Sequence, residues 1–208
     1  MKSRSVRVIK VGGSLFDFPD LVPAIHRFLD RQSPSANVLI AGGGPWADAV
    51  RQVYQWQDLN ETAAHWLCVS AMSLTARLLA HLANDCELPA SWSDVQSWAG
   101  RSDHRPDVRI LDVQTFLARN EADLPGRILP REWSATSDSI AARVAHCPGG
   151  AELVLLKSAS LTPGTPVMKA SETGYVDRFF PHAVEGLPRV RCVNLRDPQL
   201  EEVVWEWP

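Results

Sequence analysis

The sequence predicts an α/β fold with a mostly parallel central sheet. Short apolar runs alternate with segments of helical periodicity along the chain, which is the order of elements found in α/β proteins. Two of the runs, within residues 37–41 and 152–158, contain four consecutive apolar residues, VLIA and LVLL, as strands covered by helices on both faces usually do. The 208 residues suffice for one good-sized core, so we expect a single domain over residues 1–208.

Composition limits the partners that the protein can have. The 21 Lys and Arg residues against 24 Asp and Glu residues give a net charge near −3, which offers no electrostatic reason to expect nucleic acid or an anionic membrane. The apolar runs are shorter than the roughly 20 residues that span a bilayer. The N-terminal segment MKSRSVRVIK lacks the apolar core of a signal peptide. We therefore expect a cytoplasmic protein with a small-molecule substrate.

Cysteine and tryptophan give weaker signals. The four cysteines are far apart and form no CxxC pair, so neither a zinc site nor a redox motif is indicated and no metal ligand is assigned. The eight tryptophans are more than usual for this length, and we favour core or subunit-interface positions for them over a ligand wall.

The first strand is expected in the stretch VRVIKVGGSL, residues 6–15. Lysine is uncommon inside a sheet unless its ammonium group emerges at the end of the strand, and Lys10 directly precedes such an end. Gly12, Gly13 and Ser14 follow before the next helix. Glycines let backbone N–H groups approach an anion closely, and a helix start is positive. This stretch carries a phosphate-site hypothesis.

A second strand and glycine loop repeat this arrangement. After a short helix at 21–29, the apolar run 37–41 ends in three glycines, 42–44, and Pro45 stands in the first turn of a further helix. Two such loops at neighbouring strand ends would face one crevice.

The next two helices carry candidate substrate-binding residues. Three of them lie in the helix after Pro45: Trp46, Asp48 and Arg51. Asn60 is expected to cap the long apolar helix 61–83, and His65 lies in its first turns. His65 is read either as a substrate contact or as a packed, hydrogen-bonded histidine.

Asp138 is a candidate near the start of a later helix. Thr136 or Ser137 is well placed as the N-cap, which puts Asp138 in the first turn. An acidic residue there usually stabilises the helix dipole. A functional role for Asp138 requires that this turn open on the glycine crevice.

The strand 152–158 also has a lysine, Lys157, close to its end. Lys157 has the same place relative to its strand as Lys10, so the two ammonium groups could flank one transferring phosphate. The alternative is that Lys157 is a surface lysine at a strand exit. The following loop, 161–174, is too rich in Pro, Gly, Ser and Thr for regular structure and is expected to cover a ligand. Lys169 in that loop either contacts a phosphate or is solvated.

Further elements are expected between and after these motifs. Residues 84–108 read as irregular, 108–113 as a strand, and 116–117 as a turn or short helix. Residues 175–180 and the residues that follow them favour a short helix. Residues 190–195 alternate like an exposed edge strand, and 197–204 begin with Asp-Pro as a last helix.

Two familiar phosphate-binding schemes are absent. Neither glycine stretch is followed by the lysine of GxxxxGK[ST], and the third glycine of GxGxxG is missing after residues 42–44. The ordered set VIKVGGSL, VLIAGGGPWADAVR, SATSDSIAARVA and LVLLKS instead resembles the amino acid kinase superfamily over nearly the whole chain. The resemblance implies a carbamate kinase-like fold, a three-layer α/β/α sandwich.

Within that superfamily, ETAAHWLCVSAM, GYVDRFF and VNLRDP look most like the small kinases of methanofuran and related C1-carrier biosynthesis. Their archaeal representative phosphorylates an aminomethylfuran methyl phosphate. Isopentenyl phosphate kinases have a histidine just after the triple glycine, where this chain has Trp46 and Asp48. Relatives commonly carry Thr-Asp after the late strand, where this chain has Lys157 and Ser158.

The resemblance implies transfer of the γ-phosphoryl group of ATP, with Mg²⁺, to an acceptor that can itself be a phosphomonoester. It implies that Lys10 contacts the phosphoryl group, that Asp138 orients the lysines, and that the protein forms a homo-oligomer as its relatives do. Lys157 is added to the catalytic residues because of its own place at a strand end, and not because of the resemblance. Phosphate and nucleotide contacts are assigned to Gly12, Gly13, Ser14, Gly43, Gly44, Ser158 and Lys169. Acceptor contacts are assigned to Trp46, Asp48, Arg51 and His65. Two alternatives stay open: another kinase of this type, acting on uridylate or an amino acid, and a non-catalytic protein that binds a nucleotide or oxyanion.

Overall fold

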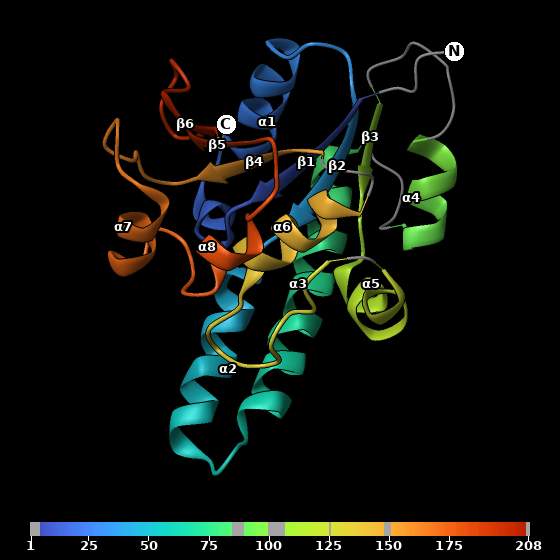
Figure 1. The fold of residues 1–208 in the computed structure, drawn as a ribbon, viewed down its shortest axis with the longest axis vertical. Coiled ribbons are helices and arrows are strands. Elements are labelled where there is room, and N and C mark those ends of the chain that lie inside the picture. Colours follow the sequence, from blue (N-terminus) through green and yellow to red (C-terminus); the bar gives the residue numbers. More distant parts are fainter. Residues whose placement is uncertain (1–4, 85–89, 100–106, 125, 148–150, 207–208) are drawn as a thin grey trace.

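The computed structural model describes residues 5–84, 90–99, 107–124, 126–147 and 151–206. Its centre is a six-stranded sheet in the order β3-β2-β1-β4-β5-β6 (Figure 1). Neighbouring strands are parallel except for β5 and β6, so the predicted mostly parallel sheet is confirmed. The strands span Val6–Val11 (β1), Ala36–Ala41 (β2), Asp107–Ile110 (β3), Glu152–Lys157 (β4), Arg189–Asn194 (β5) and Glu202–Glu206 (β6).

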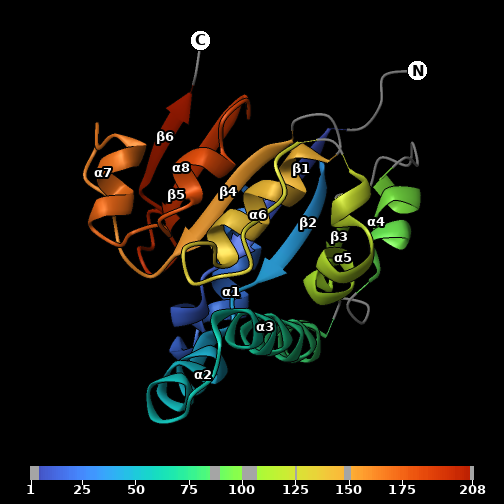
Figure 2. The same cartoon turned by 60° about the horizontal axis from the view of Figure 1, so that its bottom comes forward.

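Helices cover both faces of the sheet, which confirms the predicted α/β/α layers (Figures 1 and 2). One hydrophobic core joins α6 and α8 to one face, and a second core joins α1 and the later turns of α3 to the other face. The helices span Leu21–Asp30 (α1), Gly44–Trp56 (α2), Glu61–Ala83 (α3), Trp92–Ala99 (α4), Val113–Arg119 (α5), Ser137–His146 (α6), Val167–Glu172 (α7) and Phe180–Ala183 (α8).

Helices α2 and α3 pack side by side and project from the sheet (Figures 1 and 2). Asn60 caps α3 as predicted, because its Oδ1 accepts a hydrogen bond from Ala63 N at 2.8 Å. Helix α3 is long and apolar enough to cross a membrane, but the core helices of soluble proteins can have the same length and composition. In this fold 44% of its most apolar 18-residue window is buried.

The register of the sheet places both candidate lysines on one face. Strands β1 and β4 are parallel neighbours, with Lys10 opposite Leu155. Side chains alternate between faces, so Lys10, Leu155 and Lys157 all point to the face that α6 covers. Both lysines therefore lie near the carboxyl ends of adjacent strands.

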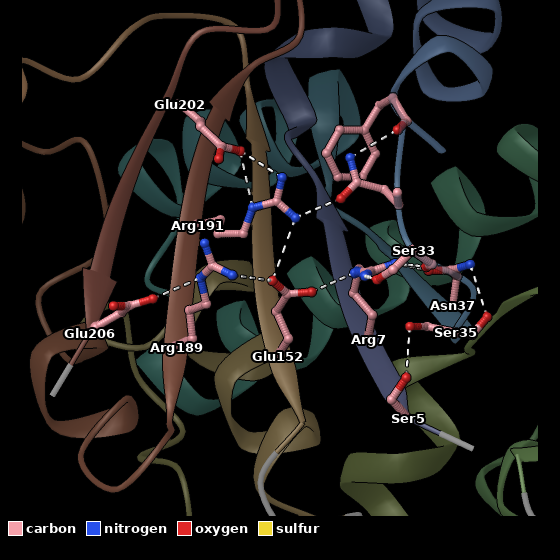
Figure 3. A network of polar contacts seen from close by, with 12 residues as sticks. Ser5, Arg7, Ser33, Ser35, Asn37, Glu152, Arg189, Arg191, Glu202 and Glu206 are labelled. Atoms are coloured by element: carbon pink, nitrogen blue, oxygen red, sulfur yellow. Dashed lines mark hydrogen bonds and ion pairs between the residues drawn. The ribbon is translucent and has the colours of Figure 1, made fainter. Parts of the chain in front are cut away.

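The opposite ends of the strands carry a network of arginines and glutamates (Figure 3). Arg7 Nε donates to Glu152 Oε2 at 2.5 Å, and Arg191 Nη1 lies 3.5 Å from the other oxygen of Glu152. Arg191 Nη2 also donates to Glu202 at 2.6 Å. Arg7 and Arg191 are buried, and buried charges are tolerated when they are paired. The network ties β1, β4, β5 and β6 together away from the lysines.

The C-terminal predictions were wrong in two places. Residues 190–194 of the segment 190–195 lie in β5, which is a buried interior strand because β6 adds to the edge that we expected β5 to form. The last helix expected over 197–204 is absent from this described segment. The Asp197 carboxylate accepts hydrogen bonds from Gln199 N and Glu201 N and so holds a tight turn before β6.

Two segments expected to be irregular contain helices. Within 84–108, of which 84, 90–99 and 107–108 are described, α4 buries Trp92 and Trp98 in the core. Within 161–174, α7 forms and buries Ala170. In both cases tertiary packing outweighs a weak local helix signal.

The strand expected over 108–113 is shorter than expected. Strand β3 ends at Ile110, and Asp112 Oδ1 accepts a hydrogen bond from Gln114 N at 3.1 Å, which caps α5. Residues 116–117, predicted to form a turn or a short helix, lie in helix α5.

Candidate active site

Three charged side chains form the centre of the candidate site. Lys10 Nζ lies 2.9 Å from Asp138 Oδ1, and Lys157 Nζ donates to Asp138 Oδ2 at 2.7 Å. The lysines come from adjacent strands, and Asp138 comes from the first turn of α6, which crosses that face of the sheet. All three side chains are at most 13% exposed. The structure therefore brings the two strand-end lysines to one shared carboxylate.

Burial and charge together set the ionisation of this centre. Burial alone would raise the pKa of Asp138, but the ammonium groups of Lys10 and Lys157 lower it to about 2. The pKa of Lys10 is lowered, chiefly by burial and further by Lys157, while Asp138 acts in the opposite direction. With both ammonium groups protonated, the centre carries one net positive charge, which suits an anionic ligand.

The glycine loops after β1 and β2 pack directly on each other. A Cβ atom on Gly13 would lie 2.6 Å from Gly44 N, and one on Gly42 would lie 2.7 Å from Gly13 N. A side chain at either position would force the two backbones apart, so glycine is required for the approach. The two loops are therefore neighbours, but none of their glycines lines the large cavity described below, and Gly43 lines the small one.

Gly12 needs a correction among the predicted phosphate donors. Its N–H donates to Leu156 O at 2.8 Å, extending the pairing of β1 with β4, and so is not available to an anion. Two residues further on, Ser14 pairs through its hydroxyl with the hydroxyl of Ser158 at 2.7 Å, which links the two strand ends beside the lysines.

Asp177 fixes the beginning of α6. Its carboxylate accepts hydrogen bonds from the backbone N–H groups of Thr136 and Ser139, both at 3.0 Å, and from both of their hydroxyl groups. Burial and the charge of Asp138 raise the pKa of Asp177, and the hydrogen bonds donated by Ser139 and Thr136 oppose that rise. Thr136 is the N-cap residue by position, as predicted, but its side chain makes no cap bond of its own.

A cavity of about 770 Å³ opens on this centre. Its floor is formed by Lys10, Asp138 and Lys157, and the start of α6 and the segment after α7 form its walls. The other lining residues are Glu61, Glu132, Trp133, Ser134, Thr136, Ser137, Ser171, Glu172, Gly174, Tyr175, Val176, Asp177 and Arg178. The volume is in the range of small-molecule sites.

A second, small cavity of about 40 Å³ adjoins the first and shares Thr136 and Ser137 with it. Gly43, Arg51 and His65 are among its lining residues. His65 is buried, and burial together with the charge of Arg131 lowers its pKa, so the imidazole is neutral at pH 7. Two of the predicted acceptor residues therefore lie beside the large cavity and not in it.

None of the remaining predicted residues lines the large cavity, including Gly12, Gly13, Ser14 and Ser158. Lys169 is 62% exposed and pairs with Glu172 at 3.1 Å. Trp46 and Asp48 are exposed on α2, where Asp48 pairs with Arg51. Gly44 packs against Gly13 but does not line either cavity.

Sequence reasoning assigned no role to the other residues that line the large cavity, among them Trp133, Tyr175 and Asp177. Lys157 Nζ donates to Tyr175 O at 2.7 Å, and Trp133 contacts the guanidinium of Arg51. Tyr175 and Asp177 belong to GYVDRFF, a stretch that carried the family resemblance without an assigned role. No local pattern reveals the cap, because Asp177 is 41 residues from Thr136.

The fold and the site together define a class of α/β protein whose parallel sheet ends in paired glycine loops and a lysine-aspartate-lysine centre for an anionic ligand. The chain belongs to the amino acid kinase family, whose sequence model matches residues 5–160.

One curated relative and several solved structures resemble the chain. The (5-(aminomethyl)furan-3-yl)methyl phosphate kinase of Methanocaldococcus jannaschii is 22% identical over 136 residues, covering 65% of this chain. The match spans 57% of that relative's length, less than two thirds. The structure of the UMP kinase of Ureaplasma parvum superposes on this one over 100% of each chain, with a TM-score of 0.64 and 12% sequence identity. The uridylate kinase of Archaeoglobus fulgidus covers 89% of each chain with a TM-score of 0.56 at 13% identity. These structures share the fold.

Proposed function

We propose that the protein is an ATP-dependent kinase that transfers the γ-phosphoryl group to a small phosphomonoester, such as an aminomethylfuran methyl phosphate. The observation that carries the proposal is the bridging of Lys10 and Lys157 by Asp138 on the floor of the cavity. Family membership and the name of the curated relative support it.

Charge neutralisation is the chemistry that this centre supplies. A phosphoryl group in transfer spreads negative charge over its equatorial oxygens, and two fixed ammonium groups stabilise that charge in a site of low exposure. Asp138 holds the ammonium groups at one place and does not need to accept a proton. An acceptor phosphate is already anionic, so its oxygen attacks the γ-phosphorus while the bond to the leaving ADP oxygen breaks, without a general base.

Mg²⁺ is the expected partner of ATP and would neutralise phosphate charge when bound. Within the described residues no group of three or more His, Cys, Asp or Glu side chains could hold a metal ion. The donor set therefore fits an ion carried mainly by the nucleotide's own phosphates, with Asp138 already engaged by both lysines.

The far wall of the cavity supports an acceptor with an amine. Glu61 and Glu132 bring carboxylates to the wall, and Trp133 brings an aromatic ring. A protonated aminomethyl group on an aromatic ring complements carboxylates and the face of an indole, while its phosphate complements the lysines. The arrangement favours a molecule with a cationic end and an anionic end over a purely anionic acceptor.

The proposal is tested by incubating the protein with ATP, Mg²⁺ and a panel of acceptors, and by identifying products by phosphorus NMR. We expect a diphosphate from the aminomethylfuran phosphate, with kcat/KM roughly tenfold or more above that for UMP. Transfer to UMP or an amino acid alone would identify another kinase of the family. A thermal shift with ATP but no turnover on any acceptor would identify a binding protein.

A non-catalytic binder remains the second candidate because one feature favours it. Lys157 already donates to Tyr175 O as well as to Asp138, so part of its hydrogen-bonding capacity is used within the protein. With Lys157 held by these bonds, the site could bind an oxyanion without the lysine moving to follow a phosphoryl group in transfer.

We also propose a homo-oligomer and a cytoplasmic location. The exposed apolar side chains of α2, Trp46, Val53 and Trp56, support the first, because such side chains are common at subunit interfaces. The free thiols of Cys68, Cys147 and Cys192 suit a reducing compartment. Light scattering of the purified protein measures the assembly state directly.

A further inference from the structure

The N-terminus of helix α6 is capped by a residue that is distant in the sequence, Asp177. Helix starts leave N–H groups without partners, and a side chain at the N-cap usually satisfies one of them. Here Thr136 occupies the N-cap position, yet its hydroxyl donates to Asp177 at 2.9 Å and makes no cap bond. The Asp177 carboxylate accepts the N–H groups of Thr136 and Ser139 in its place.

These bonds enclose the residue that organises the site. Asp138 lies between Thr136 and Ser139, whose backbone groups are both held by Asp177, so the direction of its side chain depends on that contact. Asp138 must place one oxygen within 2.9 Å of Lys10 Nζ and the other within 2.7 Å of Lys157 Nζ. A small rotation of the first turn would lengthen one of the two contacts.

The segment that carries Asp177 is itself anchored on three sides. The Ser171 hydroxyl donates to Asp177 O at 3.1 Å, and Phe179 N donates to Ser134 O at 2.9 Å. Two residues earlier, the carbonyl of Tyr175 accepts from Lys157 Nζ. One short stretch therefore contacts both α6 and a lysine of the centre.

We propose that Asp177 is a positioning residue for phosphoryl transfer, which fixes the first turn of α6 so that Asp138 bridges the two lysines. The inference rests on the proposed kinase function. Asp177 acts through Asp138 and needs no contact with the reacting atoms.

The test compares Asp177→Asn with Asp197→Asn. Asp197 is the matched control because its carboxylate also accepts two backbone N–H bonds, in the turn before β6, and it does not line the cavity. Kinetics are measured well below the melting temperature of both variants, together with amide hydrogen exchange of residues 136–140.

For Asp177→Asn we expect kcat to fall at least tenfold, KM values for ATP and the acceptor to change less than threefold, and exchange at 136–140 to accelerate. Asp177→Glu should recover less than half of the loss, since a longer side chain misplaces the carboxylate. Asp197→Asn should leave kcat and the exchange at 136–140 unchanged. An unchanged kcat with Asp177→Asn, or an equal loss with Asp197→Asn, overturns the inference.

Failure of the proposed function gives a different result. If the wild-type protein transfers no phosphoryl group to any acceptor, the kinase proposal fails. Exchange at 136–140 then decides the positioning role alone, and unchanged exchange in Asp177→Asn rejects it.

Discussion

Lys157 donates to Asp138 at 2.7 Å across a gap of 19 residues in the chain, from the end of one strand to the start of the helix before it. The same carboxylate pairs with Lys10, which lies on the neighbouring strand. Lys10 and Asp138 are buried, and the two lysines hold the pKa of Asp138 at about 2. Substitutions at this centre should therefore alter chemistry more than they alter the fold.

Lys10→Met should lower kcat by about 10²- to 10³-fold, because it removes one of the two cations that face the transferring group. The methionine keeps the apolar stem, so we expect the far-UV circular dichroism spectrum to be unchanged. Lys169→Met is the comparison variant, since Lys169 is 62% exposed and does not itself line the cavity, although its partner Glu172 does. A Lys10→Met enzyme with near-normal turnover would contradict the assigned role.

Asp138→Asn should shift the alkaline limb of the pH–rate profile to lower pH. Burial and Lys157 lower the pKa of Lys10, and Asp138 partly restores it. Without the carboxylate the pKa of Lys10 falls further, so Lys10 loses its proton at a lower pH and activity declines earlier as pH rises. The measurement is kcat against pH for both proteins, and a limb that stays in place or moves to higher pH rejects the explanation.

Gly13→Ala should destabilise the protein by about 2–3 kcal/mol, because the new Cβ would meet Gly44 N at 2.6 Å and backbone cannot move aside easily. Gly164→Ala is the comparison. Its φ of +79° makes alanine strained, but no atom lies within 4 Å of its Cβ position, so we expect a loss of about 1 kcal/mol. Urea unfolding measures both values, and equal losses would mean that the contact of the two loops is unimportant.

Glu152→Gln should lower stability by about 2–3 kcal/mol, because Arg7 and Arg191 lose a charged partner in a buried network. Glu206→Gln, at the exposed rim of the same network, should cost less than about 1 kcal/mol. Neither change should affect kcat measured well below the melting temperature, since the network lies at the opposite strand ends from Lys10. Loss of kcat in Glu152→Gln would show that the two ends of the sheet are coupled.

Local patterns were enough to locate most of the elements that build the site. The apolar run of β2 and the lysine-bearing strands β1 and β4 are continuous signals, and Asn60 capped α3 through a contact only three residues away. The C-terminal part was harder, because β6 is short and partly exposed and its acidic residues read equally well as helix. Pairing with β5, which no local pattern encodes, decided between the two.

The sequence by itself determined that Lys10 and Lys157 stand near the ends of buried strands and that Asp138 stands in the first turn of a helix, because strand and helix periodicity operate over a few residues. Only the tertiary structure decided that those strands are neighbours, that α6 directs Asp138 between them, and that Asp177 caps α6. Contacts between residues tens of positions apart depend on how the whole chain packs, and for that reason the cavity and its far wall emerged only from the fold.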